Sequence, residues 1–467
     1  MKNKLSITSA LLFLTACNLV PDFQRPGVET PTQWHDAGLA QQKSAVDPEW
    51  WRAFGSAQLN HLITESLLYN NDLAAARQRV EQARAQAKIA GANLWPSIGL
   101  QGDFTSTHNT SGDSQRDSGL FTNSSNNIGN TEREVGQFRV AYEVDLWGAN
   151  RASRDAGSAR LLSSVFTRDA LQLVVMSNVG QAYFNLLGVA ERKRITTEFL
   201  ENVTNVLAIV EARYQAGAVS ALDVAQQKTE LATARANLDL LAQQYTLSEN
   251  ALTILLGHPP QTVSFNAEHF FDLLLPVINA VQPAALLERR PDIRQAEMEL
   301  IAANADIGVA RAAFYPKLQL NLDAIIAAPQ PSGVVLAAVS SLTQPLFQGG
   351  RLEGGLENAK ARNAELVETY RKTVLTAFKE VEDAAAVRSN STRRMQALAD
   401  AVDSSRQAYQ LSLDRYRLGL IDYQTLLSTQ RSLLNAETSQ VQARQDVLVA
   451  MVQLYQALGG GWSSNQL

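Results

Sequence analysis

The chain has 467 residues, 45% of them hydrophobic and 19% charged, and a formal net charge of -5. This length suits one large domain or several ordinary ones. The chain has no basic excess, which argues against a nucleic-acid partner, because binding to a phosphate backbone needs a positive surface.

The N-terminus has the pattern of a secretory signal peptide. Lys2 and Lys4 form a positive start, and residues 5–14 are an apolar stretch too short to span a bilayer. We therefore predict that residues 1–16 are a signal peptide and that the mature protein is exported. No later apolar run approaches the roughly 20 residues of a membrane helix, so any membrane span must consist of strands.

Cys17 is the only cysteine and ends the sequence Leu-Thr-Ala-Cys. It cannot form a disulfide within the chain, and it could be an incidental small residue of a cleavage site. The four residues resemble a bacterial lipobox, which implies cleavage before Cys17, diacylglycerol on its thiol and acylation of the new amino group. Several acyl chains anchor a protein stably. In bacterial lipoproteins an Asp directly after the lipidated cysteine retains the protein in the inner membrane. This chain has Asn18 at that position, so we expect the outer membrane.

The chain repeats itself in four places. Residues 72–98 align without gaps with residues 292–318, and each segment contains an aromatic-Pro pair near its end. Three further matches follow in the same order: 146–151 with 346–351, 213–217 with 415–419, and 255–257 with 457–459. These matches predict an internal duplication. The predicted domains are a lipidated extended segment at 17–57, a first repeat at 58–270, a second repeat at 271–460 and a tail at 461–467.

Within each repeat the hydrophobic period changes from helical to strand-like. A heptad seam ends at Pro96 or Pro316, and a period of two follows. We predict membrane strands at about 96–106, 135–146, 316–326 and 334–346; the fourth alternates poorly and is inferred by symmetry. A long polar loop, 106–134, joins the first two strands.

One face of the predicted sheet is apolar and the other is polar. The predicted lumen residues on the polar face are Asp103, Arg139, Glu143, Asp145 and Asp323. Strands of about ten residues suit a tilted crossing of hydrocarbon. A sheet of a soluble protein with one solvated face would show the same alternation and the same polar residues.

A long helical tract follows each strand pair, at about 151–215 and 351–418. Some 65 helical residues extend on the order of 100 Å, so these helices need partner helices. Gly217 and Gly419 are the predicted tip turns that send the chain back.

The strand number predicts an assembly. Four strands cannot close a membrane barrel, and open edges are not tolerated in lipid. Three copies supply twelve strands, which can enclose an aqueous pore. We therefore predict an α+β membrane protein, a homotrimer with a 12-stranded β-barrel of four strands per protomer, continued by a long periplasmic α-helical barrel.

Five motifs together resemble the TolC/OprM family of outer-membrane factors, closest to the lipidated branch that serves resistance-nodulation-division (RND) pumps. The motifs are Cys17–Phe23, Tyr142–Gly148, Glu288–Ile293, Pro345–Arg351 and Leu458–Trp462. The resemblance covers essentially the whole mature chain. It implies a passive exit duct of a tripartite efflux system, anchored in outer-membrane lipid, whose periplasmic tips open like an iris when a periplasmic adaptor and an inner-membrane RND-type transporter engage it.

The resemblance also implies a periplasmic gate at the two tip turns. The charged and aromatic residues there are Arg213, Tyr214, Arg415, Tyr416, Arg417 and Asp422. Three-fold symmetry would turn each into a ring that could gate by ion pairs and stacking, with Asp422 the best single candidate. In many relatives the acid lies one residue nearer the glycine, where this chain has Ile421. A solvated helix end whose cations complement the dipole would have the same composition.

The sequence does not support catalysis. The five histidines have no ligand spacing, and there is no nucleophile–base set or phosphate-binding glycine motif. We expect no enzyme activity, cofactor or metal site. The alternative function is a periplasmic coiled-coil adaptor or scaffold lipoprotein without a pore, and secretion of proteins through the same duct also fits.

Overall fold

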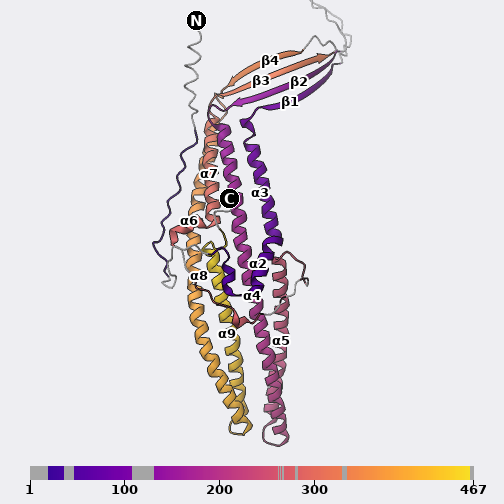
Figure 1. The fold of residues 1–467 in the computed structure, drawn as a ribbon, viewed down its shortest axis with the longest axis vertical. Coiled ribbons are helices and arrows are strands. Elements are labelled where there is room, and N and C mark those ends of the chain that lie inside the picture. The colour runs from indigo at the N-terminus through magenta and orange to yellow at the C-terminus, as the bar shows by residue number, and fades with distance from the viewer. Residues whose placement is uncertain are drawn as a thin grey trace, which may run out of the picture. The chain divides into compact units, whose positions relative to one another are not determined.

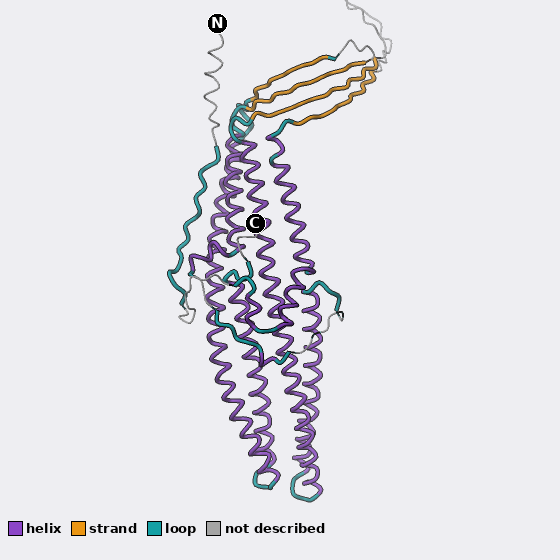
Figure 2. The backbone as a smooth tube through the Cα atoms, viewed as in Figure 1, coloured by secondary structure: helices purple, strands orange, loops and turns teal. Residues whose placement is uncertain are grey.

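The structure is a computed structural model that describes residues 19–35, 47–107, 131–260, 262, 265, 268–278, 282–328 and 334–462. Over these residues the chain is mostly helical with one small sheet (Figures 1 and 2). The predicted signal peptide, Cys17 and most of the 106–134 loop lie outside the described residues.

The element order occurs twice along the chain. The first half contains α2 (Ala57–Tyr69), α3 (Asn71–Ala90), β1 (Ser97–Thr107), β2 (Thr131–Val144), α4 (Ala149–Gln215) and α5 (Ala221–Leu255). The second half contains α6 (Leu286–Arg289), α7 (Pro291–Ala312), β3 (Lys317–Ala328), β4 (Val335–Thr343), α8 (Arg351–Arg417) and α9 (Tyr423–Ala457). The long helices α4 and α8 have 67 residues each, and α5 and α9 have 35 each.

The chain divides into two compact units, which we describe separately. The first unit takes in the described parts of residues 1–25, 82–162 and 298–367 and contains the sheet. All neighbouring strands are antiparallel, in the order β1-β2-β3-β4. Leu100 lies opposite Phe138, and Val140 lies opposite both Ile98 and Leu322. Because directly paired residues share a face, this register gathers the apolar side chains on one side.

The helices of the first unit approach closely through small residues. A Cβ added at Gly157 would lie 2.8 Å from the Cβ of Ala90, so α4 and α3 pack in close contact there. Ala156 and Ala159 of α4 form a buried cluster with alanines of α7. Small side chains at helix seams let backbones approach, as the predicted alanine-rich heptads require.

The N-terminal segment of the first unit lies along α7. Asn304 Nδ2 donates to the carbonyl oxygen of Pro21 at 2.7 Å, and Arg311 Nη1 donates to that of Leu19 at 3.2 Å. Between these contacts, Val20 packs so tightly on Gly308 that an added Cβ would lie 2.4 Å from its Cγ2. The lack of a side chain at Gly308 therefore lets the extended segment pack directly against α7.

The second unit takes in the described parts of residues 26–81, 163–297 and 368–467 and contains most of the core. Trp50, in the short 3-10 helix η2 (Trp50–Phe54), stacks on Tyr455 of α9 at a centroid distance of 5.1 Å. Short 3-10 turns η4 (Phe270–Asp272) and η5 (Pro283–Ala285) lie in the segment that leads to α6. Arg444 of α9 fastens this segment by donating to the carbonyl oxygens of residues 270, 271 and 273.

Figure 1 shows α4 with α5 and α8 with α9 as two hairpins of this unit, each ending in a short turn. Among the described helices, α4 alone has a window long and apolar enough to cross a membrane. Of that window, 67% is buried, as in the core helix of a soluble fold.

Candidate functional site

The sheet has an apolar face whose side chains are largely exposed. Ile98, Leu100 and Phe104 of β1 are 65–84% exposed, and Leu336 and Leu342 of β4 are 73% and 67% exposed. Apolar residues of β2 and β3 continue this surface between them, because the register places them on the same side. Large apolar side chains exposed together on one face mark contact with another apolar phase or protein.

The opposite face of the sheet holds paired charges. Arg139 Nε lies 2.8 Å from Asp323 Oδ1, directly across β2 and β3. Lys317 Nζ lies 3.6 Å from Glu143 Oε1, and Asp103 accepts a hydrogen bond from the side chain of Gln101. Four of the five predicted lumen residues therefore lie on one polar face, and two acids among them are partly neutralised by basic neighbours.

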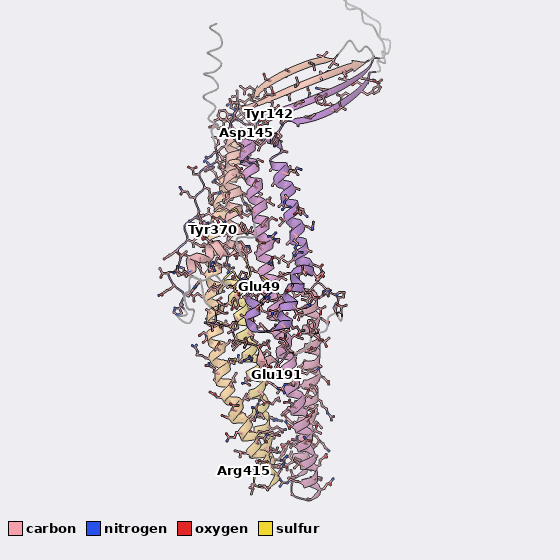
Figure 3. The ribbon with its side chains drawn as sticks, viewed as in Figure 1. Glu49, Tyr142, Asp145, Glu191, Tyr370 and Arg415 are labelled. Atoms are coloured by element: carbon pink, nitrogen blue, oxygen red, sulfur yellow. The ribbon has the colours of Figure 1, made fainter. Side chains whose placement is uncertain are left out.

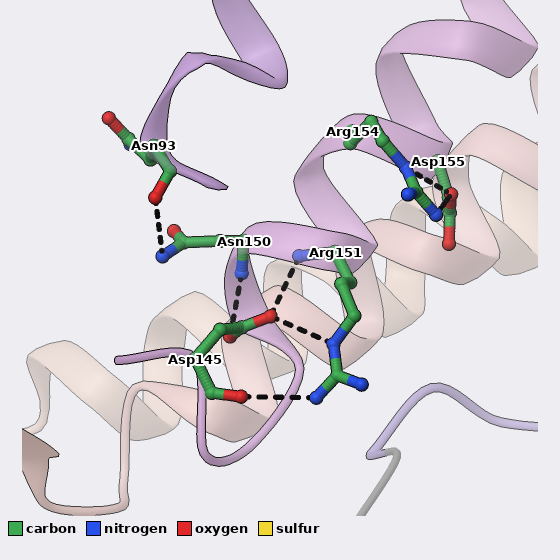
Figure 4. A network of polar contacts seen from close by, with 6 residues as sticks. All are labelled: Asn93, Asp145, Asn150, Arg151, Arg154 and Asp155. Atoms are coloured by element: carbon green, nitrogen blue, oxygen red, sulfur yellow. Dashed lines mark hydrogen bonds and ion pairs between the residues drawn. The ribbon is translucent and has the colours of Figure 1, made fainter. Parts of the chain in front are cut away.

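Asp145, the fifth predicted lumen residue, has a different position from the one expected. The strand β2 ends at Val144, and Asp145 lies in the turn that starts α4. Its carboxylate accepts from the backbone N–H of Asn150 and of Arg151 and from Arg151 Nε, each at 3.0 Å (Figure 4). These bonds satisfy orphan donors of the helix start, so the carboxylate is used within the chain rather than as a free lumenal charge.

The two tip turns have the same backbone geometry. Gly217 has a φ of 73° and Gly419 a φ of 77°, values that favour glycine because it has no Cβ. The N–H of Ala218 donates to the carbonyl of Arg213 and the N–H of Leu420 to that of Arg415, at 2.8 and 2.9 Å. Each long helix therefore ends in a Schellman-type C-cap, which explains why the turns are short.

The returning helices start with different N-caps. Ser220 forms a capping box with Asp223 at the start of α5. At the matching position of α9, Asp422 accepts a hydrogen bond from the N–H of Thr425 at 2.7 Å. This hydrogen bond from Thr425 lowers the pKa of the Asp422 carboxyl below its ordinary value. Asp422 is exposed, so it is both a helix cap and a surface charge.

Arg213 and Tyr416 join the two hairpins near their ends. The Arg213 guanidinium lies 4.7 Å from the centre of the Tyr416 ring and donates to the Tyr416 carbonyl oxygen. Tyr416 is 1% exposed, and its hydroxyl has no partner among the described residues. Burial raises the pKa of Tyr416, and the Arg213 charge opposes that shift. Tyr416 is therefore placed to hold α4 against α8 within one protomer, not to stack with its own symmetry copies.

Two further contacts between the hairpins could not be predicted from the sequence. Tyr423 donates through its hydroxyl to Gln227 Oε1 at 2.6 Å, and Gln227 Nε2 donates to the Val203 carbonyl at 2.7 Å. Arg431 Nε lies 2.9 Å from Glu230 Oε2. In the sequence pattern, Gln227 and Glu230 fall on the otherwise apolar face of a helix. This position indicates buried polar side chains but does not identify their partners.

The remaining predicted gate residues are at the surface of the tips. Arg415 is exposed near the end of α8 (Figure 3), and Tyr214 is 48% exposed. Arg417 Nη1 lies 3.7 Å from Oδ1 of Asp414, three residues earlier on the same helix end, and both side chains are more than half exposed. Exposed pairs of this kind contribute little to stability, so these side chains are available to other groups.

Comparison with known proteins identifies the family. A family model described as "Outer membrane efflux protein" matches residues 62–258 and 283–460. The chain belongs to the outer membrane efflux protein family. It is therefore an outer-membrane component of an efflux system and a member of the TolC/OprM group of channels, as its motifs predicted.

Individual relatives of the family match along their whole length. The chain is 36% identical to the pyoverdine export outer membrane protein OpmQ of Pseudomonas aeruginosa, over 100% of this chain and 98% of OpmQ. It is 31% identical to the toluene efflux pump outer membrane protein TtgC of Pseudomonas putida, over 99% and 96% of the two chains. The solved structure of the outer-membrane channel OprN superposes with a TM-score of 0.85 at 26% identity, covering 96% of this chain and 100% of OprN.

Proposed function

We propose that this family member acts as a homotrimeric exit duct, in which three four-stranded sheets close a 12-stranded β-barrel and the helices continue it as a periplasmic tube. The observation that carries the proposal is the sheet itself. Its outer strands β1 and β4 each have an open edge among the described residues, one face is apolar and exposed, and the other holds the charges. Only closure with further strands makes such a sheet compatible with lipid.

The repeated element order supports an internal duplication as the origin of this arrangement. Each half supplies one strand pair followed by a 67-residue and a 35-residue helix. We further propose that lipid on Cys17 anchors the mature chain in the outer membrane. The docking of residues 19–21 on α7 supports this, because it holds the chain just after Cys17 against the unit that contains the sheet.

The gate is proposed to consist of two layers at the tips. Arg213 with Tyr416, and Gln227 with Tyr423, hold the two hairpins of one protomer together. The exposed side chains of Asp422, Arg415, Arg417 and Tyr214 are the ones that three-fold symmetry would turn into rings. The proposed partners are a periplasmic adaptor and an inner-membrane RND-type transporter, which would open the tips by shifting one hairpin against the other.

The alternative, an adaptor or scaffold lipoprotein without a pore, fits these features less well. Such a protein would have no use for an exposed apolar sheet face beside a charged one. The charged face, with Arg139, Glu143, Lys317 and Asp323, is the surface that a water-filled lumen requires.

Planar-bilayer conductance of the purified protein tests the proposal. The wild type is compared with Asp422→Ala and with Arg417→Ala, and Asp400→Ala on α8, which also carries Arg417, serves as a charge-removal control away from the tip. Small wild-type currents that rise in the two tip variants, but not in the control, support both pore and gate. Folded trimers that conduct in none of the variants contradict the duct and favour the scaffold.

A further inference from the structure

A contact between the two halves of one chain shows how neighbouring strand pairs are joined at the base of the sheet. Trp147 follows β2, and its ring lies 4.6 Å from that of Tyr315, which precedes β3. The indole N–H of Trp147 donates to the carbonyl of Pro316 at 2.8 Å. This aromatic contact fastens the β2–β3 joint, where the strand pair of the first half meets that of the second.

The corresponding residue of the second half makes no such ring contact with the described residues. Phe347 matches Trp147 in the aligned segments 146–151 and 346–351, and it is 89% exposed. Its neighbour Leu346 is 92% exposed. Pro345 stands where the first half has Asp145, so the second junction lacks that carboxylate, and Arg351 hydrogen-bonds to Gln348 instead. Two large apolar side chains exposed side by side are expected to have a partner.

A candidate partner for Phe347 is exposed at the other edge of the same sheet. Trp95 precedes Pro96 and β1, as Tyr315 precedes Pro316 and β3, and it is 76% exposed. Within the part of the chain that the structure describes, one aromatic residue after β4 and another before β1 are therefore largely exposed. These are the two edge strands of the sheet.

We propose that Phe347 of one copy packs on Trp95 of the next copy, reproducing across the subunit boundary the Trp147–Tyr315 contact found within the chain. The inference rests on the proposed trimer and adds the residues that join its subunits at the base of the barrel. Phe347 has no N–H group, so the joint between copies is an apolar ring contact without the bond to proline. Six such contacts, three within chains and three between them, then ring the barrel.

The edge strands are compatible with this joint in charge. β4, Val335–Thr343, contains no charged residue, so Asp103 of β1 meets no like charge when the two edges pair. Apolar side chains such as Leu100 and Leu342 lie on the same face in both strands, which continues the apolar surface across the boundary. The glycines at 349 and 350 have no atoms within 4 Å of an added Cβ, so the turn after Phe347 has room for a neighbour.

Cysteine cross-linking of the full-length protein tests the proposal. Trp95→Cys and Phe347→Cys are combined in one chain and treated with a short bismaleimide in membranes. We expect covalent dimers and trimers on a denaturing gel. The matched control is Trp147→Cys with Tyr315→Cys, which should react within one chain and leave the mobility of a monomer. Each single variant shows what the native Cys17 contributes.

A second measurement follows the trimer itself. Phe347→Ala removes three contacts per trimer at once, so we expect the dissociation constant of the trimer in detergent to rise at least about tenfold. Phe347→Trp keeps an aromatic ring at this position, so we expect its trimer to be as stable as that of the wild type. If the wild type is trimeric but the 95/347 pair gives only monomers, the proposed joint is wrong while the trimer stands. If the wild type is monomeric in membranes, the proposed assembly itself fails.

Discussion

The hydrogen bond between Tyr423 and Gln227 gives the sharpest test of how the hairpins are held together. Gln227 is fully buried and Tyr423 is 3% exposed, so Tyr423→Phe leaves the Gln227 carbonyl oxygen without this donor and out of reach of water. Leaving a buried acceptor unsatisfied costs about 1–3 kcal/mol. That cost makes local opening of the hairpin ends about 5- to 150-fold more frequent.

Hydrogen–deuterium exchange of tip peptides measures this opening directly. Amides around Val203 and Gln227 should exchange faster in Tyr423→Phe by the factor given above, while amides of the sheet stay unchanged. Tyr214→Phe is the control, because Tyr214 is 48% exposed and its hydroxyl can bond to water. If Tyr423→Phe exchanges like the wild type, the hydrogen bond does not hold the hairpins and the packing alone does.

Three further perturbations act at other places in the chain. Asp145→Ala removes the acceptor used by Asn150 and Arg151, so the first turn of α4 should fray and lose about 1–2 kcal/mol, seen as faster amide exchange there. Gly308→Val places side-chain atoms where Val20 lies, so the N-terminal segment should detach and become sensitive to limited proteolysis. Burial and the nearby Glu230 raise the pKa of Tyr423, so the unfolded chain loses this proton first, and melting temperatures should fall above about pH 10, less so in Tyr423→Phe.

The substitutions at Asp145 and Gly308 each have a matched control. Asp155→Ala removes an exposed acid whose ion pair, among the described residues, is with its neighbour Arg154, and it should leave α4 intact. Gly354→Val also changes a helical glycine, but nothing lies within 4 Å of an added Cβ there, so the proteolysis pattern should not change. Equal effects in control and test variants would contradict the specific contacts.

Much of the fold could be predicted because its signals are local. The alternation of Phe138, Val140, Tyr142 and Val144 needs only the period of a strand, and β2 covers them. The turn glycines could be placed because a positive φ at a helix end nearly requires glycine. The weakly alternating fourth strand begins and ends within the predicted 334–346, but β4 is only nine residues long.

The predictions that the structure changes depend on contacts distant in sequence. Asp145 continues the alternation of β2, so its pattern is that of a strand residue, yet the strand ends one residue earlier and the helix start takes its carboxylate. Tyr416 stands beside a tip turn, so it looked like an exposed gate residue. Its burial follows from Arg213 and Tyr423, which approach from the other hairpin and from the returning helix. No local pattern encodes those neighbours.

The two N-caps at the tips separate the structural role of Asp422 from its proposed role in the gate. Ser220 and Asp422 occupy matching positions, and both accept a hydrogen bond from a backbone N–H three residues on. Serine and aspartate cap helices about equally well. The start of α9 therefore does not need the charge, and a serine at the same place in α5 does the same work.

Asp422→Ser is accordingly the substitution that divides the two roles. It should keep α9 folded, with amide exchange at Thr425 close to that of the wild type, while it removes one charge per protomer from the tips. If the charge closes the pore, conductance should rise as much as in Asp422→Ala, which loses the cap as well. If only Asp422→Ala conducts more, the current reports a frayed helix end, and Asp422 is a cap and not a gate.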